Sequence, residues 1–136
     1  MKVELKKWEP VEIKPEMYKA CYAELHDTYE GVTISLKFND TAKSLNVEFE
    51  DSVLAYQSID EGDRLKLLDY LAENYEDEFY GEWTLFKVNN SEYLNWFNNE
   101  NHGIYEEEKI DHYVFLTSSD VVDVLSVYEP KVSIQN

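Results

Sequence analysis

Apolar and polar side chains alternate without interruption over residues 32–38 and again over residues 45–50. An alternation with a period of two turns one face of a strand toward a core and the other toward water. Residues 19–25 and 53–59 are two further β-like runs, and short polar links connect the four. Sequential strands with short links pair most simply with their neighbours, so this part of the chain predicts an antiparallel meander.

After Ile59 the hydrophobic period changes to that of a helix. The spacing predicts an amphipathic helix over residues 61–75, capped by Ser58 or Asp60, with an apolar stripe formed by Leu65, Leu68 and Leu71. We expect this stripe to be buried against the strands that carry Val32, Ile34, Leu36, Val47 and Phe49. The acidic run 76–78 would follow the end of this helix, where negative charge is unfavourable to the helix dipole.

The second half of the chain continues with short elements. Strand-like runs occur three times, over residues 83–88, 112–116 and 131–134. Ser91 is positioned to cap a short helix that ends near Asn99. Residues 121–126 fit either a strand or a helix capped by the polar run before them.

The first 16 residues contain Pro10 and Pro15 and predict a peripheral arm or an edge strand, because proline removes a donor from a strand ladder. The elements together predict one α+β domain over residues 1–136. We expect a mostly antiparallel sheet, arranged as a meander, with about two helices packed on one face.

The chain is strongly acidic: 29 Asp and Glu oppose 12 Lys and Arg, which gives a formal net charge of −17. A hydrophobic content of 43% with 15% aromatic residues nevertheless indicates a folded domain. Charge this far from zero favours solubility and steers cationic partners toward the protein. It disfavours nucleic-acid binding, because phosphate contacts need Lys and Arg and the sequence has Arg64 as its sole arginine.

The sequence lacks the motifs of familiar catalytic and cofactor sites. Its four scattered glycines form no phosphate loop, and no G-x-S-x-G elbow marks the serine of a hydrolase. His26, His102 and His112 stand far apart and Cys21 is the single cysteine, so no pair has the spacing of a metal site. We therefore expect no enzymatic activity, no metal and no cofactor.

The sequence also lacks the apolar runs that enter membranes. It contains no stretch of about 18 apolar residues, the length that indicates a membrane span. Its first ten residues, MKVELKKWEP, lack the apolar centre of a signal peptide. We expect a cytoplasmic protein that has no membrane partner.

Two acidic segments concentrate the negative charge. The first interleaves carboxylates with aromatic side chains and contains no Lys or Arg, a mixture that suits an interface with a basic, partly apolar partner. A solvated helix end explains the carboxylates equally well. The candidate partner-binding residues of this segment are Asp69, Glu73, Tyr75, Glu76, Asp77, Glu78, Tyr80, Glu82 and Trp83. The second segment supplies a secondary set, Glu106, Glu107, Glu108 and Asp111.

Five segments of packing and turn residues mark the C-terminal third: SEYLNWF (91–97), HGIY (102–105), HYVFLT (112–117), DVLS (123–126) and EPKV (129–132). They resemble small acidic bacterial immunity proteins of polymorphic and contact-dependent toxin systems. The resemblance implies a cytoplasmic, non-enzymatic protein that binds one cognate toxin domain. It supplies no binding residues, because these immunity proteins share no interface motif.

Charge and resemblance together predict an acidic binding protein that neutralises a basic protein partner, such as a toxin nuclease domain. We expect it to act as a monomer or a weak homodimer. Two alternatives remain open from the sequence: a carboxylate-dependent hydrolase, and a DNA-mimic inhibitor of a nucleic-acid-binding protein.

Overall fold

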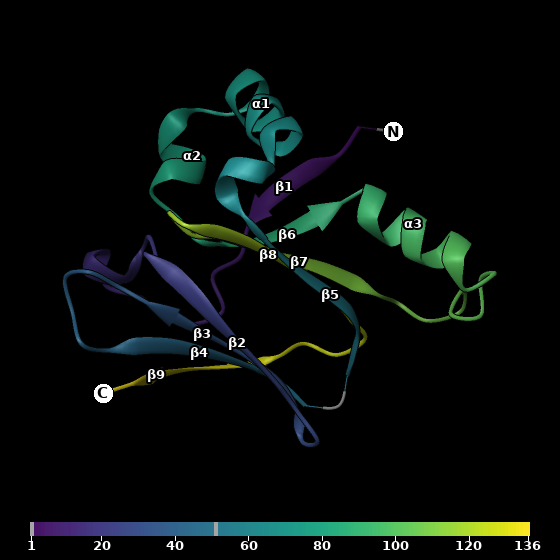
Figure 1. Ribbon diagram of the computed structural model, residues 1–136, viewed down its shortest axis with the longest axis horizontal. Helices are drawn as coiled ribbons and strands as arrows, with labels where there is room; N and C mark the ends of the chain where they lie inside the picture. Colours follow the sequence, from purple (N-terminus) through teal and green to yellow (C-terminus); the bar gives the residue numbers. More distant parts are fainter. Residues whose placement is uncertain (1, 51) are drawn as a thin grey trace.

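The strands of the computed structural model, which describes residues 2–50 and 52–136, divide between two antiparallel sheets (Figure 1). The five-stranded sheet consists, in spatial order, of β1 (Glu4–Lys7), β6 (Leu85–Asn89), β7 (Asp111–Leu116), β8 (Asp120–Ser126) and β5 (Val53–Asp60). The four-stranded sheet consists of β2 (Tyr22–Thr28), β3 (Gly31–Lys37), β4 (Ser44–Phe49) and β9 (Lys131–Gln135).

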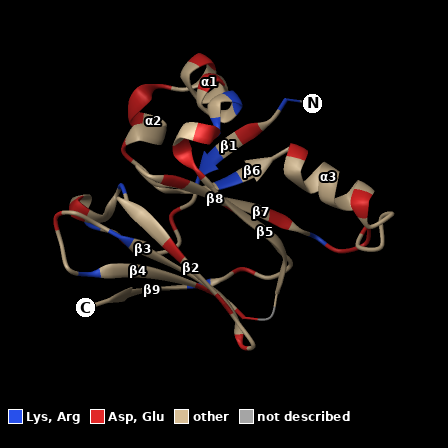
Figure 2. Cartoon of the chain, viewed as in Figure 1, with Lys and Arg blue, Asp and Glu red and all other residues tan. Residues whose placement is uncertain are grey.

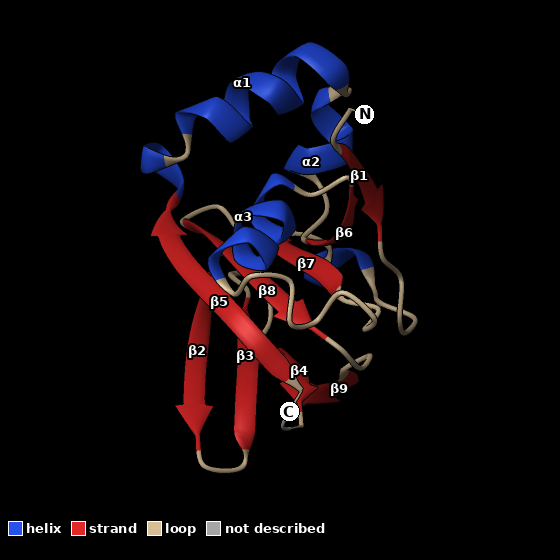
Figure 3. Ribbon diagram, turned by 90° about the vertical axis from the view of Figure 1, so that its right-hand side faces the viewer, coloured by secondary structure: helices blue, strands red, loops and turns tan. Residues whose placement is uncertain are grey.

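The helices lie on one face of the five-stranded sheet, and the four-stranded sheet packs against the other (Figures 1 and 3). They are α1 (Leu65–Asn74), α2 (Asp77–Gly81) and α3 (Glu92–Glu100), preceded by 3₁₀ turns at Pro15–Met17 and Glu61–Asp63. This arrangement confirms the predicted α+β class with mostly antiparallel strands. None of the helices in the described part of the chain is long and apolar enough to cross a membrane.

Aromatic side chains fill the space between the two sheets. Phe49 of β4 meets Tyr113 and Phe115 of β7 edge-on, with ring centroids 5.4 and 6.5 Å apart. Trp8 approaches Tyr113 in the same way at 5.0 Å. The inward residues predicted for the second and third strand-like runs are confirmed as core: Val32, Ile34, Leu36, Val47 and Phe49 are all buried. The two sheets therefore enclose one core, and the helices cover the outer face of the five-stranded sheet.

The predicted helical stripe is only partly correct. Leu71 is fully buried and Leu68 is half-buried, but Leu65 is 64% exposed. The helix begins at Leu65 because the backbone of Arg64 (φ −106°, ψ 47°) separates it from the preceding 3₁₀ turn. Moreover, α1 lies over the five-stranded sheet, on the side opposite β3 and β4 (Figure 3). The expected burial of all three leucines against those strands is wrong.

The acidic run after α1 begins a new helix instead of extending the old one. The backbone of Tyr75 is extended, and Glu76 occupies the N-cap position of α2. Asp77 and Glu78 therefore lie in the first turn of α2, where negative charge is favourable to the helix dipole. The run does follow the end of the first helix, as expected, but it also stands at the favourable start of a second helix that the sequence did not predict.

The predicted meander holds for β2, β3 and β4, which pair in chain order. β5 leaves that sheet and pairs with β8, so the fourth strand-like run belongs to the other layer. Residues 120–126 form a strand, which settles the alternative left open by the sequence. β1 is the expected edge strand, and the buried side chains of Ile13 and Met17 anchor the segment that follows it in the core.

Lys19 connects three separate parts of the chain. Its Nζ donates hydrogen bonds to the backbone carbonyls of Tyr80 at 2.7 Å, Trp83 at 3.2 Å and Leu116 at 2.6 Å. Tyr80 lies in the last turn of α2, where carbonyls have no partner within the helix. Burial lowers the pKa of Lys19 to about 8, although the charge of Glu61 acts in the opposite direction.

Candidate functional site

The first acidic segment forms an exposed surface over α1, α2 and the turn that follows. We call it the acidic surface, and its exposed carboxylates are Asp69, Glu73, Glu76, Asp77, Glu78 and Glu82. Figure 2 shows acidic positions on both helices at this corner of the molecule. The structure therefore brings the predicted carboxylates together and keeps all of them in water.

The aromatic residues of the same segment are mostly engaged within the protein. Trp83 is 6% exposed and its Nε1 donates to the Leu85 carbonyl at 2.7 Å. It is mainly a core residue, and what remains accessible of its ring lines the groove described next. Tyr75 accepts a hydrogen bond from the Leu5 backbone N–H at 2.8 Å and is half-buried. Tyr80, whose hydroxyl donates to Asp77 at 3.0 Å, is also half-buried and keeps part of its ring accessible.

A groove of about 810 Å³ lies between residues 7–13 and α2. We call it the acidic groove, because exposed carboxylates from both sides line it: Glu9, Glu12, Glu78 and Glu82. Val11, Tyr18 and Phe79 supply apolar surface inside it. Sequence reasoning found Glu78 and Glu82 but missed Glu9 and Glu12, because only the fold brings the N-terminal arm beside α2.

A cation of the protein itself already occupies the acidic groove. Nζ of Lys7 lies 5.9 Å from the ring centroid of Phe79 and 5.6 Å from that of Trp83. Ammonium groups within about 6 Å of an aromatic face are attracted by the ring quadrupole. Lys7 is exposed, so it can leave without breaking a buried contact. The groove therefore has the aromatic surface and negative potential that suit a Lys or Arg side chain.

The second acidic segment lies away from the first. Glu106, Glu107 and Glu108 are exposed in the turn between α3 and β7, and Asp111 begins β7 half-buried. Figure 2 shows this turn beyond α3, on the opposite side of the view from α2. The two predicted sets of carboxylates thus belong to different surfaces.

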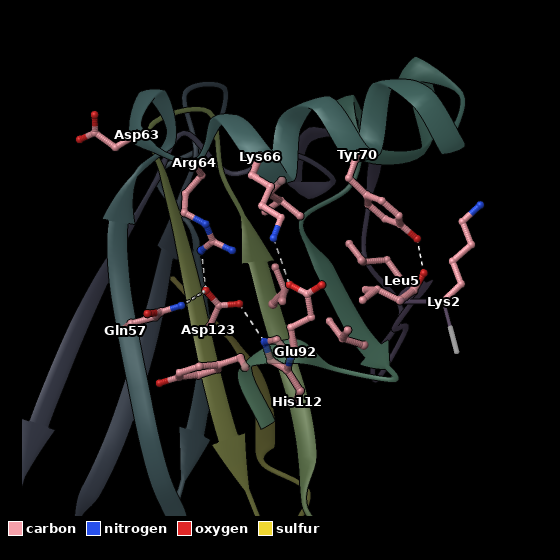
Figure 4. A pocket seen from close by; sticks show the side chains of 15 residues that line it. Lys2, Leu5, Gln57, Asp63, Arg64, Lys66, Tyr70, Glu92, His112 and Asp123 are labelled. Atoms are coloured by element: carbon pink, nitrogen blue, oxygen red, sulfur yellow. Dashed lines mark hydrogen bonds and ion pairs between the residues drawn. The ribbon is translucent and has the colours of Figure 1, made fainter. Parts of the chain in front are cut away.

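A cavity of about 630 Å³ lies on the helix-covered face of the five-stranded sheet, beneath α1 (Figure 4). Next to it runs a chain of hydrogen-bonded side chains, which we call the polar row: Ser91, His112, Asp123 and Arg64. Nε2 of His112 is 2.8 Å from Oδ1 of Asp123, and Nη1 of Arg64 donates to Oδ2 of Asp123 at 2.6 Å. Gln57 Nε2 also donates to Oδ2, at 3.1 Å, and Ser91 Oγ is 2.7 Å from His112 Nδ1.

Asp123 remains ionised although it is only 1% exposed. Burial by itself would raise the pKa of the carboxyl group. The hydrogen bond and charge of His112, together with those of Arg64, outweigh burial and hold the pKa of Asp123 below its ordinary value. His112 contacts Asp123 through Nε2 and the Ser91 hydroxyl through Nδ1, so each member of the row has a partner.

The polar row has the composition of a Ser-His-Asp hydrolase but not its accessibility. Ser91 is 4% exposed, and its Oγ accepts the Leu94 backbone N–H at 2.9 Å as the N-cap of α3. Ser91 is not among the described residues that line the cavity. Because a nucleophile must reach its substrate, the geometry gives Ser91 a capping role, and the cap predicted at this position is confirmed.

Sequence reasoning missed the polar row. One signal was available: Asp123 stands in the apolar run VVDVL, and a charge in a buried strand needs a partner. The partner itself could not be inferred, because it depends on register. Asp123 lies opposite Val114 of β7, which places it beside His112 on the same face.

Among the described residues, no group of three or more His, Cys, Asp or Glu side chains is placed to hold a metal ion. Comparisons with protein family models, with curated proteins and with solved structures find no match to this chain. The function must therefore be argued from the acidic groove, the acidic surface and the cavity themselves.

Proposed function

We propose that this protein is a non-enzymatic acidic binding protein that neutralises a basic protein partner, as an immunity protein neutralises a toxin domain. The acidic groove is the observation that carries the proposal. Exposed carboxylates on both of its sides surround an aromatic surface that already holds an ammonium group. A Lys or Arg side chain of the partner would replace Lys7 there and gain the same contacts.

The carboxylates would act mainly on the rate of association. The net charge of −17 and the acidic surface beside the groove create a field that attracts a cationic protein before contact. This attraction is screened by salt, over a Debye length of about 8 Å at physiological ionic strength. We therefore expect fast association that slows steeply as salt is added.

The aromatic side chains would act mainly on the rate of dissociation. Phe79 and Tyr80 are half-buried on α2, and Tyr18, in the groove lining, is 38% exposed. Partly exposed aromatic rings beside charged groups are frequent among the residues that dominate interface energies. Their burial against the partner would slow the escape of a bound Lys or Arg.

The experiment begins by capturing the partner from a lysate of the source organism with tagged protein. Association kinetics with the purified partner are then measured for the triple charge reversal Glu76→Lys, Asp77→Lys and Glu78→Lys. The reversal should lower the association rate constant by at least about tenfold and flatten its salt dependence.

The matched control reverses Glu106, Glu107 and Glu108, which changes the net charge equally at the other acidic segment. If only the control variant associates slowly, the interface lies at the α3–β7 turn and the assignment to the acidic groove is wrong. If both variants associate as fast as the wild type, charge does not steer this protein and the proposal fails.

A second variant tests the groove itself. Lys7→Met removes the resident ammonium while keeping the length of the side chain, so a partner cation no longer has to displace it. Lys6→Met is the control, because Lys6 pairs with Glu4 and does not line the groove. Binding should tighten for the Lys7 variant more than for the Lys6 variant. Equal affinities for the two variants would place the partner elsewhere.

A further inference from the structure

The cavity beneath α1 has the size and lining of a small-molecule site and plays no part in the proposed function. Its volume of about 630 Å³ falls within the range of about 300–1,000 Å³ found for ligand pockets. Five apolar side chains contribute to its wall: Val3, Leu5, Leu67, Val88 and Val114. Tyr70 and Tyr93 add aromatic surface. This wall suits an apolar ligand body.

The carboxylates and the cations at the cavity differ in whether they are free to bind a ligand. Asp123 contacts His112, Arg64 and Gln57, so both of its oxygens already have partners. Asp63 points away from the cavity in Figure 4. Glu92, the third carboxylate of the lining, pairs with Lys66, so none of the three is placed as a free acceptor for a ligand cation.

Arg64 is fixed so that part of its guanidinium group faces the cavity. One terminal nitrogen donates to Asp123, and Figure 4 shows the other turned along the cavity toward Lys66. A guanidinium group offers five N–H donors in a rigid plane, so the bond to Asp123 leaves donors for a second anion. Asp123 thus positions Arg64 and leaves other N–H donors of its guanidinium group free.

Lys66 provides a second cation that a ligand can recruit. Its Nζ lies 3.6 Å from Oε2 of Glu92, and the two side chains are 90% and 71% exposed. Exposed pairs of this kind contribute little to stability and exchange readily. An anionic ligand group would replace Glu92 as the partner of Lys66 and bind the free side of Arg64 at the same time.

Tyr93 is one of the residues that line the cavity. Burial, with the charge of Asp123 adding to it, raises the pKa of Tyr93 to about 12. Its hydroxyl therefore keeps its proton at neutral pH. The cavity wall therefore combines apolar and aromatic side chains with the cationic donors of Arg64 and Lys66.

We propose that this cavity binds a small organic anion, an apolar or aromatic body that carries one carboxylate, sulfonate or phosphate group held by Arg64 and Lys66. The probe for the test is 8-anilinonaphthalene-1-sulfonate, whose fluorescence rises in apolar surroundings. N-phenyl-1-naphthylamine has the same aromatic body without the sulfonate and serves as the ligand control. The folded protein should bind the sulfonate at one saturable site and the neutral compound at least about tenfold more weakly.

Two exposed residues give variants with opposite effects. Lys66→Gln should weaken binding of the sulfonate by about fivefold, whereas Glu92→Gln should tighten it, because Glu92 competes for Lys66. Lys43→Gln and Glu30→Gln change the net charge equally away from the cavity, and both should leave the affinity within about twofold. Urea denaturation of each variant confirms that it is folded.

Amide chemical shifts locate the probe. Perturbations should gather at residues 64–70, at the start of α3 and on β7. Equal affinity for the charged and neutral compounds would show that the cavity selects apolar bodies alone, and the proposal would be wrong. Perturbations confined to the acidic groove, unchanged affinity in both cavity variants, or no saturable binding would overturn it as well. None of these outcomes tests the proposed binding of a basic protein partner at the acidic groove.

Discussion

Nε2 of His112 and Oδ1 of Asp123 are 2.8 Å apart, and this contact links the neighbouring strands β7 and β8 on the helix-covered face of their sheet. The other carboxylate oxygen of Asp123 binds Arg64, the residue immediately before α1. One buried carboxylate thus fixes the start of a helix over two strands. Removal of one partner from a buried charge cluster is strongly destabilising, because the remaining charges lose their compensation.

Asp123→Asn should therefore reduce the free energy of unfolding by about 3–5 kcal/mol, the usual effect of breaking a buried ion pair. The change keeps the shape of the side chain and removes its charge. Asp69→Asn on the exposed side of α1 is the control and should stay within about 0.5 kcal/mol of the wild type. Urea denaturation measures both variants. If Asp123→Asn lost no more unfolding free energy than Asp69→Asn, the stabilising role given to Asp123 in the polar row would be contradicted.

The same carboxylate predicts the response to acid. Its pKa is lower in the folded protein than its ordinary value of 3.8, so the unfolded chain binds the proton first as the pH falls. The stability supplied by Asp123 is therefore fully present above the ordinary pKa and is lost as the pH falls through the folded pKa. The difference in unfolding free energy between the wild type and Asp123→Asn should be constant from pH 7 to about 5 and shrink only in stronger acid. A difference that shrinks already near pH 6 would contradict the assignment of this stability to Asp123.

Lys19 predicts a response at alkaline pH. Burial lowers its pKa to about 8 in the folded protein, against an ordinary value of 10.5. Between these values the unfolded chain binds more protons, so the stability contributed by Lys19 rises with pH across this window. Lys19→Met cannot titrate. The unfolding free energy of the wild type, relative to this variant, should increase from pH 8 to 10 and stay level from pH 6 to 7. A relative decrease over the alkaline range would show that the ammonium form is the favoured one.

Tyr113 is fully buried in the core, and its hydroxyl has no hydrogen-bond partner among the described residues. Burial raises the pKa of Tyr113, and the charges of Asp111 and Glu129 act in the same direction. Tyr113→Phe removes an unpaired polar group and preserves the ring contacts with Trp8 and Phe49. Its thermal and urea stability should equal or exceed that of the wild type. A loss of more than about 1 kcal/mol would reveal a hydrogen bond to water.

The two ends of the leucine stripe on α1 give a matched pair of variants. Leu71 is fully buried, so Leu71→Ala should cost about 2–5 kcal/mol. Leu65 is 64% exposed, and Leu65→Ala in the first turn of the same helix should stay within about 0.5 kcal/mol of the wild type. Urea denaturation of both variants checks the orientation of α1. Similar losses at the two positions would mean that the helix is rotated.

The buried faces of β3 and β4 could be predicted because a period of two follows from strand geometry, whatever the strand pairs with. The division into two sheets could not. β5 has the same β-like composition as its predecessors, yet it pairs with β8 from the far end of the chain. Such non-local pairing depends on register and layer packing, which local patterns do not encode.

Arg64 shows that the start of α1 also could not be predicted from local sequence patterns. The side chain reaches Asp123, 59 positions later, while the backbone at Arg64 interrupts the predicted helix before α1. The same distinction applies to the candidate site, where some features follow from residue type and others from tertiary packing. The exposed carboxylates on α2 follow from residue type, because ionised side chains stay in water unless they are paired. The groove between α2 and the N-terminal arm, and the burial of Trp83, follow from tertiary packing.

The pairing of β4 with β9 sets an order for folding on the ribosome. β2, β3 and β4 are joined by short turns and can pair as soon as residue 49 has emerged. β1 has no partner strand until β6 is synthesised, since Glu4 pairs with Asn89. The edge of β4 that pairs with β9 likewise stays unpaired until residues 131–135 have been synthesised. During this interval the edge is a template for strands of other nascent chains, so slow translation of the last third of the chain would favour aggregation over closure of the sheet.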